Sequence, residues 1–182
     1  MTTLADDTQL GGQVLERIVF SEDVVQLRVR ELGAEITAAY TASDRLLVLG
    51  LLKGSFLFMA DLVRLITLPL HVDFLVAASY GRSKVSSGDV RLLYDPAASL
   101  KGRAVLIVED IIDSGNTLNR LIPRLEARGP SSLEVCALLH KRLSTLDQEP
   151  RWVGFDAPNE FLVGYGLDYV EGFRHLPYIA SL

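Results

Sequence analysis

The chain has 182 residues, a hydrophobic share of 49% and a formal net charge of −5 at pH 7. This length suits a single domain with a full core, and the acidic balance argues against nonspecific binding to nucleic acid or to an anionic membrane. No apolar run reaches the roughly 20 residues of a membrane span, because Arg64 and Pro69 interrupt the best candidate. The single cysteine, Cys136, excludes an intramolecular disulfide and predicts a cytoplasmic location.

Strand and helix patterns alternate along the chain, which predicts an α/β fold. A strand at 17–20 comes first, and Ser21 can then cap a helix that runs to about Tyr40 with an apolar stripe on one face. The next helix follows the loop at Lys53 and ends near Ile66. Further strands are expected, in chain order, at 46–51, 72–78, 90–94, 104–108, 133–139 and 152–155.

A third helix is predicted from Thr117 to a stop signal at Gly129 and Pro130. Pro123 falls inside this helix, where proline removes a hydrogen bond and costs about 3 kcal/mol in a regular helix. We therefore expect either a kink at Pro123 or a later start of the helix.

The most informative segment of the chain runs from Val105 to Leu118. It begins with an unbroken β-branched and aliphatic run, which is typical of a buried strand in a parallel sheet. Glu109 and Asp110 follow at the point where the strand should leave the core, and a small-residue loop then leads into the third helix. Parts in this order indicate a site for a phosphorylated, metal-bound ligand at the carboxyl edge of a sheet.

The chemistry of this segment follows from the start of its helix, where backbone N–H groups lack internal partners and the helix dipole is positive. A phosphate monoester fits there if the neighbouring side chains are small. The loop residues are Asp113, Ser114, Gly115, Asn116 and Thr117. Glu109 and Asp110 would repel phosphate but can bind ligand hydroxyls or Mg²⁺, and Asp113 is placed where a general base could reach a substrate.

The 105–118 segment resembles the phosphoribosyl-pyrophosphate motif of the type I phosphoribosyltransferases. Other segments narrow the resemblance to the hypoxanthine-guanine phosphoribosyltransferase family in its bacterial form. These segments are the pyrophosphate-like loop 51–56, the polar loop 79–88, the lysine segment 139–142 and the carboxyl-terminal segment 161–174. The resemblance runs from about Ile18 to Ile179 and keeps the order of the family's motifs.

The resemblance implies the type I phosphoribosyltransferase fold, in which a central, mostly parallel sheet is flanked by helices. A small hood formed by the N- and C-terminal segments would complete it. We expect one domain over 1–182, with a flexible tail at 1–12, a core over about 40–142, and a hood from about 13–22 and 150–182. The family commonly forms homodimers or homotetramers, so we expect one of these states.

The resemblance also implies a role for each motif residue. The ribose would bind Glu109 and Asp110, and the 5′-phosphate would bind the 113–117 loop. The diphosphate would contact Lys53, Gly54, Ser79, Tyr80 and Arg174. The purine would contact Lys141, Phe161, Leu162 and Asp168. The ligands of Mg²⁺ would be Glu109, Asp110 and Asp168. The Leu52–Lys53 peptide can be cis in this family, and the 79–88 loop would be mobile and close over the site.

The implied reaction transfers the 5-phosphoribosyl group of 5-phosphoribosyl-1-pyrophosphate to N9 of hypoxanthine or guanine. Asp113 would accept the proton of N7, and the aromatic ring of Phe161 would stack on the base. Lys141 would donate to the carbonyl of a 6-oxopurine and reject adenine, whose amino group is itself a donor. Backbone carbonyls at Leu162 and Asp168 could accept the exocyclic amine of guanine.

Two alternatives remain open at this point. The first is a regulator that senses phosphoribosyl pyrophosphate and binds RNA or DNA, but such a protein should carry a basic face, and this chain is acidic. The second is a transferase for another base, xanthine or a pyrimidine. Lys141 and the 161–168 segment favour a 6-oxopurine without ranking hypoxanthine, guanine and xanthine.

Overall fold

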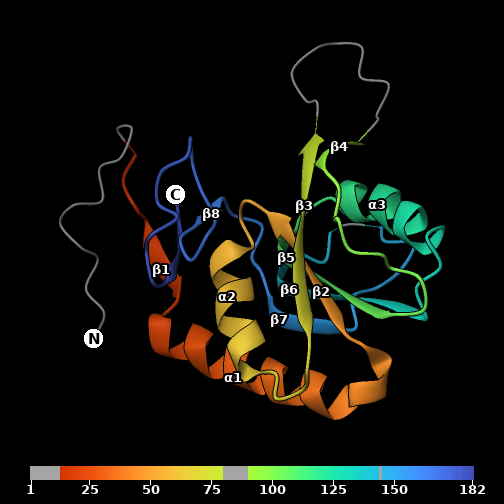
Figure 1. Ribbon diagram of the computed structural model, residues 1–182. Coiled ribbons are helices and arrows are strands. Elements are labelled where there is room, and N and C mark those ends of the chain that lie inside the picture. Colours follow the sequence, from red (N-terminus) through yellow and green to blue (C-terminus); the bar gives the residue numbers. More distant parts are fainter. Residues whose placement is uncertain (1–12, 80–89, 144) are drawn as a thin grey trace.

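The computed structural model describes residues 13–79, 90–143 and 145–182, and it contains two sheets (Figure 1). The larger sheet has six strands in the order β4-β3-β2-β5-β6-β7. Its strands are β2 (Leu47–Leu52), β3 (His71–Ser79), β4 (Val90–Tyr94), β5 (Ala104–Ile112), β6 (Ser132–His140) and β7 (Trp152–Asp156). All neighbours are parallel except β3 and β4, which confirms the predicted α/β architecture.

Helices pack against both faces of this sheet, because alternate residues of its central strands point to opposite sides. Val48 and Leu106 belong to one buried cluster and Leu47 and Val105 to another. The helices are α1 (Glu22–Ala39), α2 (Phe56–Leu65), α3 (Asn116–Glu126) and a short 3-10 helix (Ala42–Asp44). Helices α1 and α2 contribute to the first cluster and α3 to the second.

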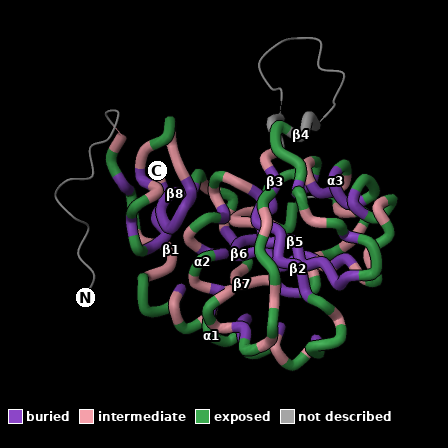
Figure 2. The backbone as a smooth tube through the Cα atoms, in the orientation of Figure 1, coloured by how far each residue is buried: buried purple, intermediate pink, exposed green. Residues whose placement is uncertain are grey.

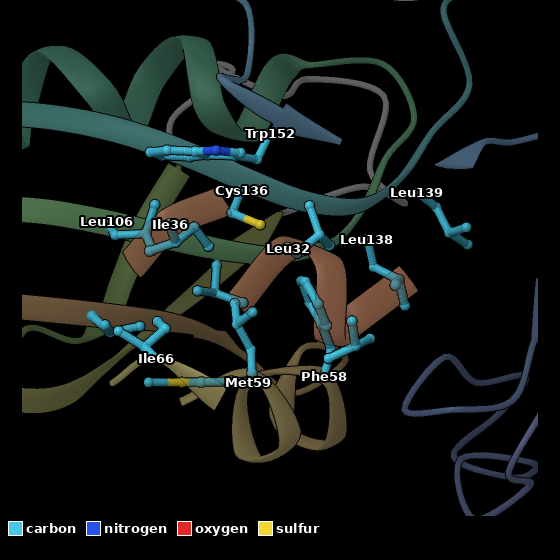
Figure 3. Close-up of a cluster of buried hydrophobic side chains, with 14 of the residues drawn as sticks. Leu32, Ile36, Phe58, Met59, Ile66, Leu106, Cys136, Leu138, Leu139 and Trp152 are labelled. Atoms are coloured by element: carbon cyan, nitrogen blue, oxygen red, sulfur yellow. The ribbon is translucent and has the colours of Figure 1, made fainter. Parts of the chain in front are cut away.

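The first cluster shows how the sheet and two helices share one core. Figure 3 places Leu32 of α1 and Phe58 of α2 beside side chains of the strands, among them Leu106 and Leu138. The burial map agrees, since the inner strands are largely buried and the outer faces of the helices are exposed (Figure 2). Among the helices of the described residues, none has both the length and the apolar character to cross a bilayer.

The smaller sheet joins segments from the two ends of the described chain. Its antiparallel strands have the order β1-β9-β8. They are β1 (Arg17–Phe20), β8 (Leu162–Val163) and β9 (Ile179–Ser181). This sheet has its own buried cluster, which includes Val163, Phe173 and Tyr178. Phe173 is fully buried, so the segment that follows β8 is anchored in this cluster.

The element boundaries differ from the sequence-based predictions in two informative places. Strand β5 runs to Ile112 and not to residue 108, because β6 continues to pair with it as far as His140 opposite Ile112. The acidic pair therefore lies inside the strand. The short strands β8 and β9 were not predicted, since two or three residues are too few to show a period of two.

Two local predictions about the helices hold only in part. Helix α3 begins at Asn116, one residue before the predicted start, and continues through Pro123, so the later start is excluded. Ser21 does occupy the N-cap position of α1, but its hydroxyl caps no backbone N–H among the described residues. The backbone carbonyl of Ser21 instead accepts the first helical bond, from the N–H of Val25 at 3.0 Å.

Pro123 is exposed and lies in the interior of α3, so it denies the helix one backbone hydrogen bond without adding buried surface. We expect Pro123→Ala to raise the free energy of unfolding by about 1–2 kcal/mol, because the gain in helix propensity exceeds the lost restraint on the unfolded chain. Urea unfolding measures this change, with Arg120→Ala as a control on the same helix. An unchanged or lower stability would contradict the expectation.

Candidate active site

The carboxyl ends of β2 and β5 open into a pocket of about 550 Å³. Distant parts of the chain line it, chiefly the loop after β2, the end of β5 and the segment after β8, with single residues from β3, β4 and α3. Among the lining residues are Leu52, Lys53, Gly54, Glu109, Asp110, Thr117, Asp168, Glu171 and Arg174. Six predicted site residues outside the 113–117 loop thus meet in one cavity, as expected for the carboxyl edge of a parallel sheet.

A second, smaller pocket of about 90 Å³ adjoins the first, since Glu109 and Thr117 line both. Its lining also includes Asp113, Ser114 and Gly115, which belong to the loop that precedes α3. Gly115 is the N-cap of α3 and has φ +74°, a left-handed conformation that glycine adopts at little cost. The positive end of an 11-residue helix therefore faces this small cavity.

The acidic pair at the end of β5 is partly buried at the edge of the larger pocket, which both residues line. Burial raises the pKa of Glu109 well above its ordinary value, and burial raises the pKa of Asp110 to about 6 although the charge of Arg174 opposes this. Among the described residues, none donates a hydrogen bond to the buried Oε2 atom of Glu109. A buried carboxylate oxygen without a partner is costly, so this position suits a ligand that brings hydroxyl groups or a cation.

Gly54 lets the loop after β2 approach Asp110 closely. A Cβ atom at this position would lie 1.7 Å from Oδ2 of Asp110, so any side chain here would displace the Asp110 carboxylate. The preceding Leu52–Lys53 peptide bond is cis, which confirms the expectation from the sequence.

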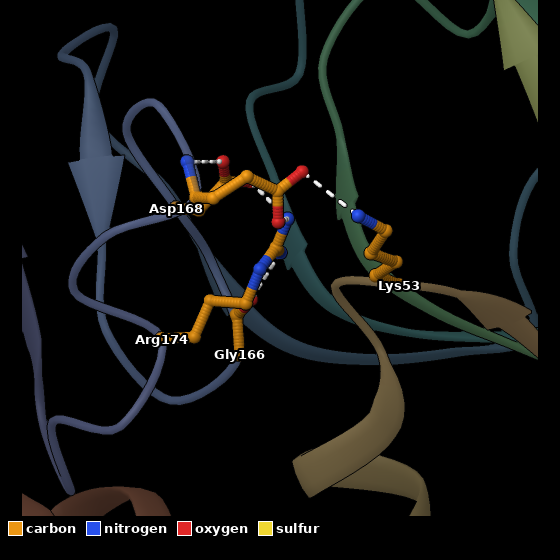
Figure 4. A network of polar contacts seen from close by, with 5 residues as sticks. Lys53, Gly166, Asp168 and Arg174 are labelled. Atoms are coloured by element: carbon orange, nitrogen blue, oxygen red, sulfur yellow. Dashed lines mark hydrogen bonds and ion pairs between the residues drawn. The ribbon is translucent and has the colours of Figure 1, made fainter.

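Two cationic side chains border the larger pocket and share one carboxylate (Figure 4). The ammonium group of Lys53 lies 2.9 Å from Oε1 of Glu171, and the guanidinium of Arg174 lies 3.2 Å from Oε2 of the same residue. Arg174 also lies 2.8 Å from Oδ1 of Asp168 and donates to the carbonyl of Gly166 at 2.7 Å. Arg174 is thereby held firmly, while Lys53 is two-thirds exposed.

Glu171 was not among the predicted site residues. Its only signal in the sequence is its position, three residues after Asp168 and three before Arg174. Its partner Lys53 is 118 positions away, so no local pattern reveals the contact.

Lys141 and Asp113 lie next to each other at the ends of β6 and β5. The backbone N–H of Lys141 donates to the carbonyl of Ile112 at 3.0 Å, which fixes the start of the segment that follows β6. The ammonium group of Lys141 lies 3.5 Å from Oδ2 of Asp113. The Lys141 side chain is only 11% exposed, whereas that of Asp113 is 67% exposed. A mostly buried donor therefore stands beside an accessible carboxylate.

An exposed aromatic residue directly precedes β8 of the smaller sheet. The ring of Phe161 is 54% exposed and meets Tyr169 edge to face, with centroids 5.7 Å apart. The N–H of Leu182 donates to the carbonyl of Phe161, so Leu162, the next residue, turns its carbonyl away from β9. Because β8 is the edge strand, this carbonyl faces the open side of the sheet.

The predicted loop 79–88 falls almost wholly outside the described residues. Tyr80 lies outside them, and of Ser79, the last residue of β3, only the backbone is described. The roles expected for these two residues stay predictions.

Comparison with known proteins connects this geometry to a family. The model of the phosphoribosyl transferase domain matches residues 23–170. The hypoxanthine phosphoribosyltransferase of Haemophilus influenzae is 46% identical over 168 residues, which cover 91% of this chain and 94% of the relative. The hypoxanthine-guanine phosphoribosyltransferase of Dictyostelium discoideum is 44% identical, with coverages of 91% and 94%. A crystal structure of a hypoxanthine phosphoribosyltransferase from Staphylococcus aureus superposes with a TM-score of 0.87 at 40% identity, covering 92% of this chain and 91% of that one.

The buried acidic pair predicts a pH-dependent cost to stability. Between the ordinary pKa of an aspartate, 3.8, and the raised value of about 6, folded Asp110 binds a proton that the unfolded chain releases. The protein therefore loses stability as pH rises through this window. Without divalent cations, we expect Asp110→Asn to be more stable by about 1–3 kcal/mol above pH 6, and the gain to vanish near pH 4.

Urea unfolding at several pH values checks this expectation. The exposed carboxylate of Glu126 supplies the control, Glu126→Gln, which should show no such pH-dependent gain. A gain that grows toward low pH would show that the sign of the effect is wrong.

Proposed function

The chain belongs to the phosphoribosyl transferase family, and we propose that it is a purine salvage enzyme that acts on 6-oxopurines. It transfers the 5-phosphoribosyl group from 5-phosphoribosyl-1-pyrophosphate to N9 of hypoxanthine or guanine, and it releases pyrophosphate with the purine mononucleotide. Relatives with this activity in their names cover more than nine-tenths of the chain. The observation that carries the proposal is the meeting of a phosphate-sized pocket, a buried acidic pair and Lys141 at one edge of the sheet.

The sugar of the substrate would lie across the two adjoining pockets. Its 5′-phosphate would occupy the small pocket of the 113–117 loop, where the start of α3 offers N–H donors. Its hydroxyl groups would then reach Glu109 and Asp110, and one of them could donate to the unpartnered Oε2 of Glu109. The diphosphate would lie near Lys53, Gly54 and Arg174, and Ser79 and Tyr80 would add to these contacts.

The acidic residues of the larger pocket fit Mg²⁺ bound together with the substrate. The raised pKa values of Glu109 and Asp110 mean that both carboxylates would be stabilised by a nearby cation. Within the described parts of the chain, no three acidic, His or Cys side chains converge to hold a metal by themselves. Mg²⁺ keeps several waters and takes substrate oxygens as ligands, so waters and the substrate would complete its coordination beside these carboxylates.

We place the ligands of this ion at Glu109, Asp110 and Asp168. When bound, Mg²⁺ would neutralise charge on the departing diphosphate.

Asp113 and the side chains near it would bind and deprotonate the purine. Asp113 is accessible and would accept the proton of N7 while N9 attacks the anomeric carbon. Glu109 and Asp110 would stabilise the positive charge that develops on the sugar as the diphosphate departs.

Recognition of the base would fall to residues on both sides of its ring. Lys141 would donate to the 6-oxo group, and its ammonium would meet a second donor if adenine were bound. The exposed ring of Phe161 would stack on the base, and the outward carbonyl of Leu162 could accept the exocyclic amine of guanine, as could that of Asp168.

We also propose that the protein works in the cytoplasm as a homodimer or homotetramer. The lone Cys136 is buried and needs no oxidising compartment. Phe74 and Tyr94 are exposed on the adjacent strands β3 and β4, where a second copy could cover them.

Turnover of different bases tests the proposed function directly. With phosphoribosyl pyrophosphate and Mg²⁺, we expect purified protein to convert hypoxanthine or guanine but not adenine, and to stop when the metal is chelated. Xanthine should be included, because it shares the 6-oxo group that Lys141 would read. Binding of phosphoribosyl pyrophosphate without turnover of any base would favour the regulatory alternative.

Asp113→Asn tests the general base. The substitution should lower kcat about 10²- to 10⁴-fold, because the amide cannot accept the N7 proton. Binding of phosphoribosyl pyrophosphate should change little, since the loop backbone stays in place. Asp95→Asn, an exposed carboxylate outside the pockets, is the matched control. Wild-type turnover in Asp113→Asn would remove Asp113 from this role.

A further inference from the structure

Glu171 binds the two cations that the proposed function assigns to the diphosphate. Its Oε1 atom lies 2.9 Å from the ammonium of Lys53, and its Oε2 atom lies 3.2 Å from the guanidinium of Arg174 (Figure 4). We propose that this carboxylate is an internal substitute for the diphosphate, which holds Lys53 and Arg174 in the free protein and is displaced when the substrate binds. This inference rests on the proposed function for the identity of the displacing anion.

The two ion pairs are positioned to be exchanged. The Glu171 and Lys53 side chains are 65% and 67% exposed, and exposed ion pairs of this kind contribute little stability. A diphosphate carries more charge and more acceptor oxygens than one carboxylate, so it can replace Glu171 at both cations. Arg174 keeps its contacts with Asp168 and Gly166 and would stay in place during the exchange.

The backbone around Glu171 is strained in a way that packing does not explain. Tyr169 and Gly172 exchange backbone hydrogen bonds across a tight turn, and the two residues between them, Val170 and Glu171, have φ values of +49° and +65°. Such turns normally use glycine or asparagine, and a β-branched residue at positive φ is a rare outlier. Val170 is 81% exposed, so no buried contact compensates for its strain.

This strained turn aims the carboxylate. The N–H of Glu171 donates to Oδ2 of Asp168 at 2.9 Å, so the turn is tied to the same acidic residue that contacts Arg174. Strain that is retained at an exposed turn beside a site is typical of functional segments. Here its effect is to hold Glu171 across the mouth of the pocket, between cations from two distant segments.

The exchange affects both substrate binding and product release. On entry, the diphosphate must compete with Glu171, which weakens substrate binding. After the reaction, Glu171 pairs again with Lys53 and Arg174 as pyrophosphate dissociates, so both cations regain a partner at once. Glu171 thus lowers the affinity for substrate and product diphosphates alike and favours product release.

Glu171→Gln tests whether Glu171 substitutes for the diphosphate, because glutamine removes the charge and keeps the shape of the side chain. With Mg²⁺ at low ionic strength, we expect titration calorimetry to show about three- to tenfold tighter binding of pyrophosphate, which is the range expected when the two ion pairs of one exposed carboxylate no longer compete. The difference should shrink at about 0.5 M salt, where such pairs are screened. Glu149→Gln, which removes an equally exposed carboxylate paired with Arg142, should bind pyrophosphate as the parent does.

The outcomes separate this inference from the proposed function. Unchanged or weaker pyrophosphate binding in Glu171→Gln overturns the proposed role of Glu171. Weaker binding would show that Glu171 assists binding of the diphosphate. The inference is also overturned if the parent protein does not bind pyrophosphate. Inosine monophosphate, which lacks a diphosphate, should bind the parent and Glu171→Gln equally. If no base is turned over but Glu171→Gln still binds pyrophosphate more tightly than the parent, the proposed reaction fails while the proposed role of Glu171 stands. Glu171→Ala repeats the test should Glu171→Gln fail to fold.

Discussion

The burial of two carboxylates at the end of β5 is the constraint around which the site is organised. Strand β6 pairs with β5 as far as Ile112, so Glu109 and Asp110 remain in the sheet, half-buried, and the pKa of each carboxyl is raised. The nearby chain accommodates this cost. Gly54 leaves room for Asp110, and the charge of Arg174 partly offsets the effect of burial on its pKa. The remaining cost is met only when a ligand brings donors or a cation to Glu109.

Charge on the opposite wall of the pocket is balanced within the protein itself. Lys53 and Arg174 are paired with Glu171 and Asp168, so neither cation depends on a ligand for a partner. This balance keeps the cations close to where a diphosphate would need them, which reduces the ordering that binding requires. The two walls thus differ, since Oε2 of Glu109 lacks a partner, whereas each cation already has a carboxylate partner, with only the Nε atom of Arg174 unpaired among the described residues.

Sequence patterns predicted much of this arrangement, because the order of strands and helices follows from hydrophobic periodicity and strand ends meet at one edge of a parallel sheet. That rule brought Lys53, Glu109 and Asp110 together. What it could not predict depends on contacts between distant residues. The extra length of β5 depends on β6, and the contact of Glu171 with Lys53 depends on a turn whose residues, Val and Glu, give no turn signal. The path of α3 through Pro123 likewise reflects packing of its apolar face, which outweighs propensity.

The smaller sheet links recognition of the base to recognition of the diphosphate. Strand β9 pairs with β1 on one side and β8 on the other, so residues from both ends of the described chain hold β8 at the edge. Phe161 and Leu162 at this edge would contact the purine, and the same continuous segment reaches Arg174, which lines the larger pocket. Phe173 anchors this segment in the cluster beneath the sheet. Because one anchored segment carries residues proposed for both parts of the site, a shift of the turn at Glu171 when diphosphate binds would act on the same piece of chain that would stack on the base.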